Sequence, residues 1–382
     1  MTYKLRFRIN ALYDFFICLL IFLYMMEATS WTSFNNSVIH DAFQLLAIAV
    51  AAVYIVVRKY TSKELLRIIV LNAVGFLCFL SSGLSGLFMT MMAITLLPKN
   101  SLNHVLKMIF MEEVTIFCAI VLGSQIGLLS NAVVEINKNT YIATARTLGF
   151  AHPNMLAAQA TSIVLLFLCV KRNRLKKEYF TGAYFSIILI YFFAHGRTSL
   201  LLGMTAVTLI ALRKKNWVNK MVLTVLPGVY VFVIAVLIVC MTVYSKNGET
   251  AIVKILNDGL FNGRIGLAYT SLLVYPITLF GKQIDTGIWN QWQYYSLDNG
   301  QVMILLEYGI AGFLCYFWTV QKTLNQIKKE KETVFAIVMI VFLAWSMYEG
   351  TMYFIGKNFA LLFLGTIEFR ESSDVKNEVK TI

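Results

Sequence analysis

The stretch Phe180–Leu212, FTGAYFSIILIYFFAHGRTSLLLGMTAVTLIAL, places a short polar seam between two apolar runs, 180–194 and 199–212. Apolar runs separated by short polar turns are typical of helices that cross the hydrocarbon core of a bilayer, which is about 30 Å thick. A guanidinium at membrane depth is costly and is kept mainly for function. The stretch therefore predicts membrane-spanning helices and a functional role for Arg197, which lies in the seam.

The composition extends this reading to the whole chain. Of 382 residues, 58% are hydrophobic and 14% charged, and the mean hydropathy is +0.70. A soluble globule is excluded by these values. We predict an all-α, polytopic integral membrane protein with about twelve transmembrane helices. The predicted spans lie near residues 10–26, 40–57, 66–81, 84–97, 104–124, 153–170, 180–194, 198–212, 221–243, 301–319, 333–348 and 352–367.

The basic residues predict the orientation of these spans. The formal net charge is +13, but most Lys and Arg residues lie in short segments between apolar runs, which is typical of cytoplasmic loops. The charge therefore favours a topological role over nucleic-acid binding, and it predicts that both termini are cytoplasmic. The main basic segments are residues 58–67, 171–177, 213–220 and 322–331.

We predict a single transmembrane domain over residues 1–370 and a cytoplasmic tail over 371–382. Two long external loops, about 125–152 and 244–300, interrupt the domain. Long loops on a rigid membrane scaffold often carry function.

Three arginines on the predicted external side, Arg146, Arg197 and Arg264, lie close to glycines. Arginine offers a planar fork of donors that matches phosphate oxygens, and it stays charged when desolvated. The three are candidates for binding the diphosphate of a lipid-linked substrate. The alternative is that each anchors a helix end at the interface or pairs with a nearby carboxylate.

The sequence His152-Pro153-Asn154 opens the sixth predicted span. Proline suits the first turn of a helix, so we expect His152 close to the N-cap at the external interface. Its imidazole is a candidate donor to a phosphate or base for a sugar hydroxyl, and a purely structural cap is the alternative. Asn154 is a candidate glycan ligand.

Acids on the external side are candidates for activating an acceptor hydroxyl. Asp298 precedes the tenth span, and Glu307 lies about two turns inside it. His152, Asp298 and Glu307 are all candidate catalytic bases, and the sequence does not choose among them. The alternative for these acids, and for Glu349, is a salt bridge to Lys357 or to one of the arginines.

The second external loop is rich in aromatic and amide side chains. Trp289 and Trp292 are candidates for stacking on sugar rings, with Asn299 as a polar glycan ligand. An interfacial aromatic belt is the alternative.

Several absences narrow the function. The sequence has no G-x-x-x-x-G-K-[ST], no H-E-x-x-H and no Asp-x-Asp, which disfavours an ATP-driven pump, a zinc protease and metal-held nucleotide sugars. The six cysteines form no C-x-x-C pair. We therefore predict no metal and no cofactor.

Short motifs in this order resemble the bacterial O-antigen and capsular polysaccharide polymerases, the Wzy family, which is related to the O-antigen ligases. The resemblance covers roughly residues 140–312. The motifs are Arg146–Asn154, His195–Leu200, Asn262–Ile265 followed by the Gly281 segment, and Asp298–Gly300 with Tyr308–Ile310.

The resemblance implies a glycosyltransferase of the GT-C type in the bacterial cytoplasmic membrane. Such an enzyme joins undecaprenyl-diphosphate-linked oligosaccharide repeat units at the outer face, with the lipid diphosphate as leaving group. It also implies that Arg197 and Arg264 correspond to essential arginines, and that a flippase and a chain-length regulator of the same pathway are partners. His195 departs from the family pattern, where many members have a small residue such as Ser, so no role is carried over to it.

Two other functions remain open from the sequence. A ligase would transfer the finished glycan to a non-lipid acceptor. A flippase or secondary transporter would place basic residues along the membrane midplane and show internal duplication, whereas here the arginines lie at one predicted face and no duplication is visible.

Overall fold

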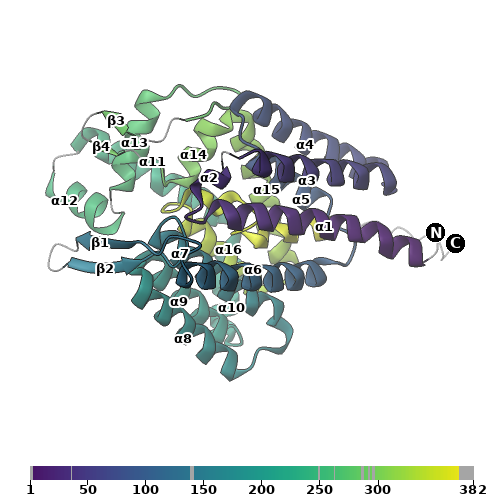
Figure 1. Cartoon of the computed structure of the whole chain (residues 1–382), viewed down its shortest axis with the longest axis horizontal. Helices are drawn as coiled ribbons and strands as arrows, with labels where there is room; N and C mark the ends of the chain where they lie inside the picture. Colours follow the sequence, from purple (N-terminus) through teal and green to yellow (C-terminus); the bar gives the residue numbers. More distant parts are fainter. Residues whose placement is uncertain are drawn as a thin grey trace. The chain divides into compact units, whose positions relative to one another are not determined.

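The computed structural model describes residues 3–35, 37–137, 142–247, 250–261, 263–284, 288–290, 293–294 and 297–369. Most of these residues are helical, as predicted (Figure 1). The helices group into two compact units, each built from separate parts of the chain. Unit 1 comprises residues 1–61, 96–219 and 365–382, and unit 2 comprises residues 62–95 and 220–364.

Unit 1 contains long helices and one β-hairpin. Its elements are α1 (Tyr3–Glu27), α2 (Thr32–Asn35), α3 (Val38–Val57), α6 (Leu102–Gln125), β1 (Val133–Asn137), β2 (Ile142–Arg146), α7 (Pro153–Val170), the 3₁₀ turn η1 (Arg172–Arg174), α8 (Lys177–Ala194), α9 (Arg197–Leu212) and the start of α10 (Asn216–Val225).

Unit 2 contains shorter and more often interrupted helices than unit 1, and a second small hairpin. Its elements are α4 (Ser62–Ser82), α5 (Gly86–Thr95), the end of α10, η2 (Leu226–Gly228), α11 (Val229–Asn247), α12 (Ala251–Lys254), the π-helical η3 (Ile255–Leu260), α13 (Arg264–Val274), β3 (Ile288–Asn290), β4 (Gln293–Tyr294), α14 (Gly300–Glu307), α15 (Gly309–Glu330), α16 (Thr333–Trp345), η4 (Gly350–Tyr353) and most of η5 (Phe359–Phe369).

Within the described residues, five helical segments are long and apolar enough to cross a membrane, so the prediction of a helical membrane protein is confirmed at this level. Shorter apolar helices, α5, α9, α13 and α16, occupy other predicted positions or the second loop. The five segments are Ile9–Glu27, Val38–Val57, Ser62–Ser82, Pro153–Val170 and Asn216–Lys246.

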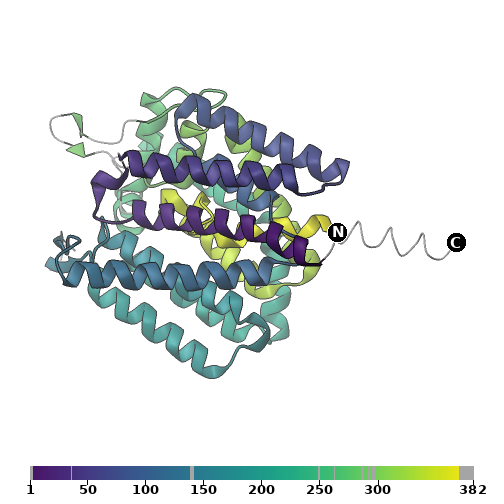
Figure 2. The same ribbon diagram turned by 45° about the vertical axis from the view of Figure 1, so that its right-hand side comes forward.

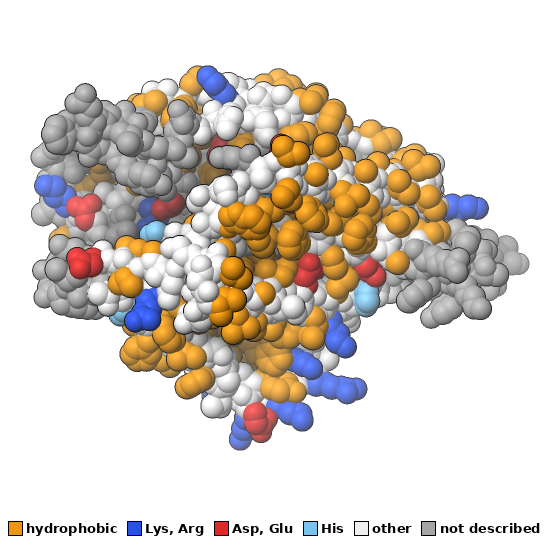
Figure 3. All heavy atoms as spheres, viewed as in Figure 1, with side chains coloured by type: hydrophobic (Ala, Val, Ile, Leu, Met, Phe, Trp, Pro, Cys, Tyr) orange, Lys and Arg blue, Asp and Glu red, His pale blue; other side chains and the backbone are white. Residues whose placement is uncertain are grey.

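Apolar side chains lie on the outer surface of several helices, both among these five segments and outside them. On α3, Val38 and Val56 are each 84% exposed, and on α8 Phe185 and Phe192 are 66% and 68% exposed. Figure 3 shows apolar side chains crowded over α3 and over α4. Surfaces of this kind are excluded from water in a stable protein, so lipid is their natural environment.

In unit 1, α1 lies between α3 and α6 (Figure 2). The segment before α7 passes the C-terminal ends of α1 and α6. The Ala151 N–H donates to the Ala28 carbonyl at 3.0 Å, and the rings of Phe150 and Phe117 lie 5.4 Å apart. The C-terminal ends of α1 and α6 and the start of α7 therefore share one end of this unit.

The basic segments of unit 1 lie at the opposite end. Arg58, which follows α3, donates to the Leu96 carbonyl at 2.8 Å, shortly before α6 begins. The Arg213 guanidinium after α9 lies 6.0 Å from the ring centre of Phe180, early in α8. Figure 3 shows Lys and Arg side chains gathered there, away from the β1–β2 hairpin. We call this the basic end, formed by residues 58–59, 171–177 and 213–215.

Three expectations need correction. The predicted span 301–319 is interrupted, because α14 ends at Glu307 and α15 begins at Gly309. The predicted span 352–367 is not an α-helix but contains 3₁₀ segments, η4 and η5. The fold is also not purely α, because two antiparallel two-stranded sheets form in the predicted external loops.

Candidate functional site

Three of the predicted site residues of unit 1 occur where β2 ends and α7 and α9 begin. Arg146 is the last residue of β2, His152 precedes α7, and Arg197 is the first residue of α9. All three side chains are exposed. We call this end of unit 1, formed by residues 146–154 and 194–197, the histidine end.

His152 is the N-cap of α7, as the sequence predicts. Its Nδ1 accepts a hydrogen bond from the Asn154 N–H at 3.1 Å. A backbone N–H can only donate, so Nδ1 must be the unprotonated nitrogen and the neutral ring carries its proton on Nε2. This arrangement favours donation from Nε2 to an anion over a role as catalytic base.

A close contact between helices brings the α8–α9 turn to the start of α7. A Cβ added at Gly196 would lie 2.6 Å from the Ala157 Cβ, so a larger residue would push the turn away. His195 before it adopts a left-handed conformation with φ of 50°. Gly196 therefore lets α9 begin next to the first turns of α7, with Arg197 at its N-terminus.

Two local features of the histidine end suit an anion, although the C-terminal ends of α1, α6 and α8 also lie at this end. Among the described residues, Arg146 and Arg197 have no hydrogen bond or ion pair from their side chains. The helices α7 and α9 both begin here, and helix N-termini carry partial positive charge and unpaired N–H groups. The carboxylate of Glu27, at the end of α1, lies 2.9 Å from the His40 Nε2, so this acid already has a partner.

The third arginine belongs to unit 2 and has a carboxylate partner. Arg264 is the first residue of α13, and its guanidinium lies 3.1 Å from the Asp298 carboxylate. The two side chains are 12% and 37% exposed. This is the ion pair that the sequence left as an alternative, and it engages one Asp298 oxygen.

Asn299 acts as the N-cap of α14. Its side-chain oxygen accepts from the N–H groups of Gln301 and Val302, each at 3.1 Å, and its amide donates to the Met347 carbonyl at 3.3 Å. The side chain is 2% exposed. These contacts favour a structural role over glycan binding.

Glu307 is the last residue of α14 and is 6% exposed. Its Oε2 accepts a hydrogen bond from the Tyr353 hydroxyl at 3.2 Å. On either side of Tyr353 in the sequence, Lys357 and Glu349 form an ion pair at 3.6 Å, which is again the alternative that the sequence left open. Glu307 is therefore less accessible than Asp298.

Comparison with protein-family models, curated proteins and solved structures gives no match to this chain. The family resemblance of its short motifs remains a prediction.

The candidate residues of the second loop are only partly described. Trp289 lies in β3, but its side chain falls outside the described residues, and so does the whole of Trp292. Across the described part of the chain, no group of three or more His, Cys, Asp and Glu side chains could hold a metal ion.

Sequence reasoning missed a buried polar network behind α14. The Tyr230 hydroxyl donates to the Gln301 side-chain oxygen at 2.8 Å, and the Gln301 amide donates to the Ser346 hydroxyl. These residues lie far apart in the sequence, inside apolar runs, so no local pattern identifies them.

Proposed function

We propose that this protein is a polysaccharide polymerase of the bacterial cytoplasmic membrane. It joins undecaprenyl-diphosphate-linked oligosaccharide repeat units at the outer face, with twelve spans arranged in a GT-C-like fold. The observation that carries this proposal is Arg197. This exposed arginine has no ion pair among the described residues and lies beside the start of α7, at the end of unit 1 opposite the basic end.

The position of the basic end supports the outward assignment of Arg197. Cytoplasmic loops carry the excess of Lys and Arg, so the basic end of unit 1 is expected in the cytoplasm. The helices α7, α8 and α9 contact one another and connect by short turns. The histidine end, at their opposite termini, then faces the external side, where lipid-linked repeat units are polymerised in this proposal.

In the proposed reaction, a hydroxyl of the acceptor repeat unit attacks the anomeric carbon of the donor glycan. The bond from that carbon to the diphosphate oxygen breaks, and the lipid diphosphate leaves with its electron pair. Arg197 and Arg146 stabilise the negative charge of a diphosphate, and His152 donates to it from Nε2. The arginine guanidinium groups stabilise the negative charge on the leaving diphosphate, which is the role of a metal ion in other glycosyltransferases.

The proton of the acceptor hydroxyl passes to a carboxylate. Asp298 and Glu307 remain the candidates, and Asp298 is the more exposed of the two, at 37%. The Arg264 guanidinium, 3.1 Å from the Asp298 carboxylate, holds it in place. Glu307 is buried behind Tyr353 and needs a local movement to meet a sugar.

The test is to replace Arg197 by Ala and by Lys in a polymer-producing strain and to size the lipid-linked glycans. Loss of one charge-stabilising donor typically lowers turnover by about 10²–10³-fold, and Lys keeps the charge without the fork. We expect single repeat units to accumulate at the outer face in both variants. Arg174→Ala is the matched control, because Arg174 is an exposed arginine at the basic end, and it is expected to polymerise normally.

The same experiment separates the other candidate functions. Repeat units trapped in the cytoplasmic leaflet would indicate a flippase. Normal polymer that stays on its lipid carrier would indicate a ligase. Full polymerisation by Arg197→Ala would overturn the proposed role of the histidine end.

A further inference from the structure

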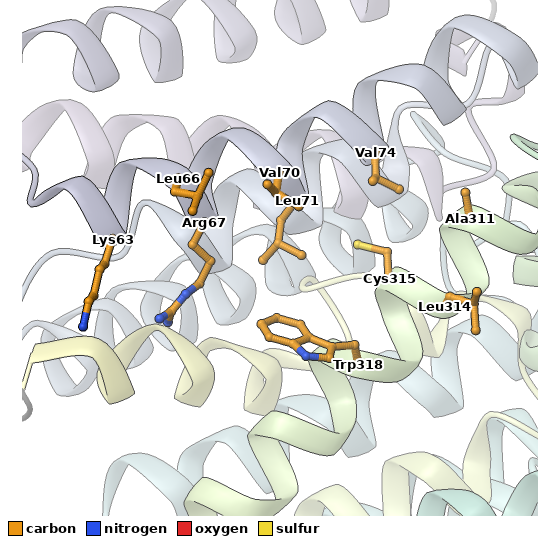
Figure 4. Close-up of a pocket in the computed structure, with 10 residues that line it drawn as sticks. All are labelled: Lys63, Leu66, Arg67, Val70, Leu71, Val74, Ala311, Leu314, Cys315 and Trp318. Carbon is orange, nitrogen blue, oxygen red and sulfur yellow. The ribbon is translucent and has the colours of Figure 1, made fainter.

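An apolar groove of about 710 Å³ lies between α4 and α15 in unit 2. One wall comes from residues 63–74 of α4 and the other from residues 311–318 of α15, and in both helices the lining positions recur every three or four residues (Figure 4). This spacing places the lining residues on one face of each helix. The groove therefore runs between two packed helices, and the buried side chains of Leu71 and Cys315 lie at its base.

The two ends of the groove differ in charge. Lys63 and Arg67, one helical turn apart on α4, lie at one end, and the indole of Trp318 lies next to Arg67 on the side toward the middle of the groove (Figure 4). Val74, Ala311 and Leu314 line the other end. A ligand that fits has an anionic head and an apolar tail.

The length of the groove indicates what kind of apolar tail it can hold. A helix rises about 1.5 Å per residue, so the α4 wall from Lys63 to Val74 spans about 16 Å. One leaflet contributes about half of the 30 Å hydrocarbon core. The apolar part of the α4 wall beyond Arg67 spans about 10 Å, so it accommodates the upper part of an acyl chain of one leaflet. The basic pair with Trp318 lies where headgroups and interfacial aromatic residues are found.

We propose that this groove is a binding site for an anionic phospholipid, with one acyl chain along α4 and α15 and the headgroup phosphate on Lys63 and Arg67. Since these two residues belong to a predicted cytoplasmic segment, the lipid comes from the cytoplasmic leaflet. This inference does not depend on the proposed polymerase activity.

Native mass spectrometry of the purified full chain, delipidated and titrated with phosphatidylglycerol or with phosphatidylcholine of the same acyl chains, tests the site. Each basic residue near an anionic headgroup is expected to contribute about fivefold in affinity, so the pair gives a preference for phosphatidylglycerol of about 25-fold. The double variant Lys63→Ala/Arg67→Ala is expected to lose this preference. The matched control Lys214→Ala/Lys215→Ala, an exposed pair outside the groove, is expected to keep it.

A second variant tests the apolar part of the site. Leu71→Trp fills the floor of the groove and is expected to weaken binding of both lipids at least fivefold. A preference for phosphatidylglycerol that survives in Lys63→Ala/Arg67→Ala, or that is lost equally in the control, would overturn the proposal. So would equal affinity for the two lipids in the unmodified protein, or dimer formation that replaces lipid binding.

Discussion

The ion pair between Arg264 and Asp298 joins side chains that are 12% and 37% exposed, so water screens it only in part. In the proposed mechanism this pair also orients the candidate base. Its strength and its catalytic role can be measured separately, because stability responds to the ion pair and turnover responds to the carboxylate.

We expect Arg264→Ala, Asp298→Ala and the double variant to show a coupling free energy of about 1 kcal/mol, near the upper end of the range for partly exposed pairs. The measurement is the free energy of unfolding of the purified protein in detergent. Strictly additive effects would show that the pair contributes nothing to stability. Asp298→Asn and Glu307→Gln, assayed for polymer length, then identify which carboxylate the reaction needs.

His152 can be separated into its capping and anion-binding roles. His152→Ala removes the N-cap of α7 and is expected to destabilise the protein by about 1 kcal/mol. His152→Asn supplies another cap and is expected to retain stability. If the imidazole also donates to a phosphate, His152→Asn loses polymer formation while unfolding normally. Normal polymer formation by this variant would show that His152 only caps α7 and does not bind the phosphate.

At the scale of elements, the break between α14 and α15 is the main departure from a continuous span. The segment 278–282 packs against this break, where the Ile310 N–H donates to the Thr278 carbonyl at 3.0 Å. The Lys282 N–H donates to the Leu306 carbonyl at the end of α14, at 3.2 Å, and two groups on α4 donate to carbonyls beside the break. Cys78 donates to Tyr308 at 3.1 Å, and Ser81 donates to Gly281 at 2.7 Å. In an apolar environment, backbone carbonyl and N–H groups need hydrogen-bond partners inside the protein. These contacts supply such partners, so they stabilise the break between α14 and α15.

Gly281→Ala tests this feature. Gly281 has φ of 87°, and a Cβ there would collide with the backbone of Glu307. The left-handed conformation alone costs about 1–2 kcal/mol for a residue with a side chain, so we expect a destabilisation of more than about 2 kcal/mol. The measurement is the thermal unfolding temperature in detergent.

The control for this variant is Gly182→Ala. Gly182 lies in α8 with nothing within 4 Å of an added Cβ, and Ala favours a helix interior. We expect this variant to be as stable as the unmodified protein or more so. Equal stability of Gly281→Ala and Gly182→Ala would show that the break tolerates a side chain.

At the scale of the whole molecule, the predicted orientation makes the two ends of unit 1 chemically distinguishable in cells. Cysteines placed at 146 and 152 are expected to react with a membrane-impermeant maleimide in intact cells. Cysteines at 174 and 214 are expected to react only after permeabilisation. The unmodified chain is the background, because its six cysteines lie inside apolar runs. Labelling of 146 and 174 from the same side would contradict the predicted orientation.

The sequence was sufficient for features that depend on local composition. Apolar runs must become helices because backbone groups in hydrocarbon need internal partners, and five long apolar helical segments confirm this among the described residues. The cap at His152 was predictable because proline and a polar residue mark a helix start. Arg197 stood out because one charge interrupts an apolar stretch.

Only the tertiary structure decided what these residues contact. The partner of Arg264, the burial of Glu307 and the bond from the Asn299 amide to Met347 depend on segments that are distant in the sequence. The break at Tyr308–Gly309 escaped prediction because long apolar runs lie on both sides of Glu307–Gly309 and read as one continuous span. Local sequence determines which segments leave water, whereas pairing of polar groups inside the protein depends on three-dimensional packing, which no local pattern encodes.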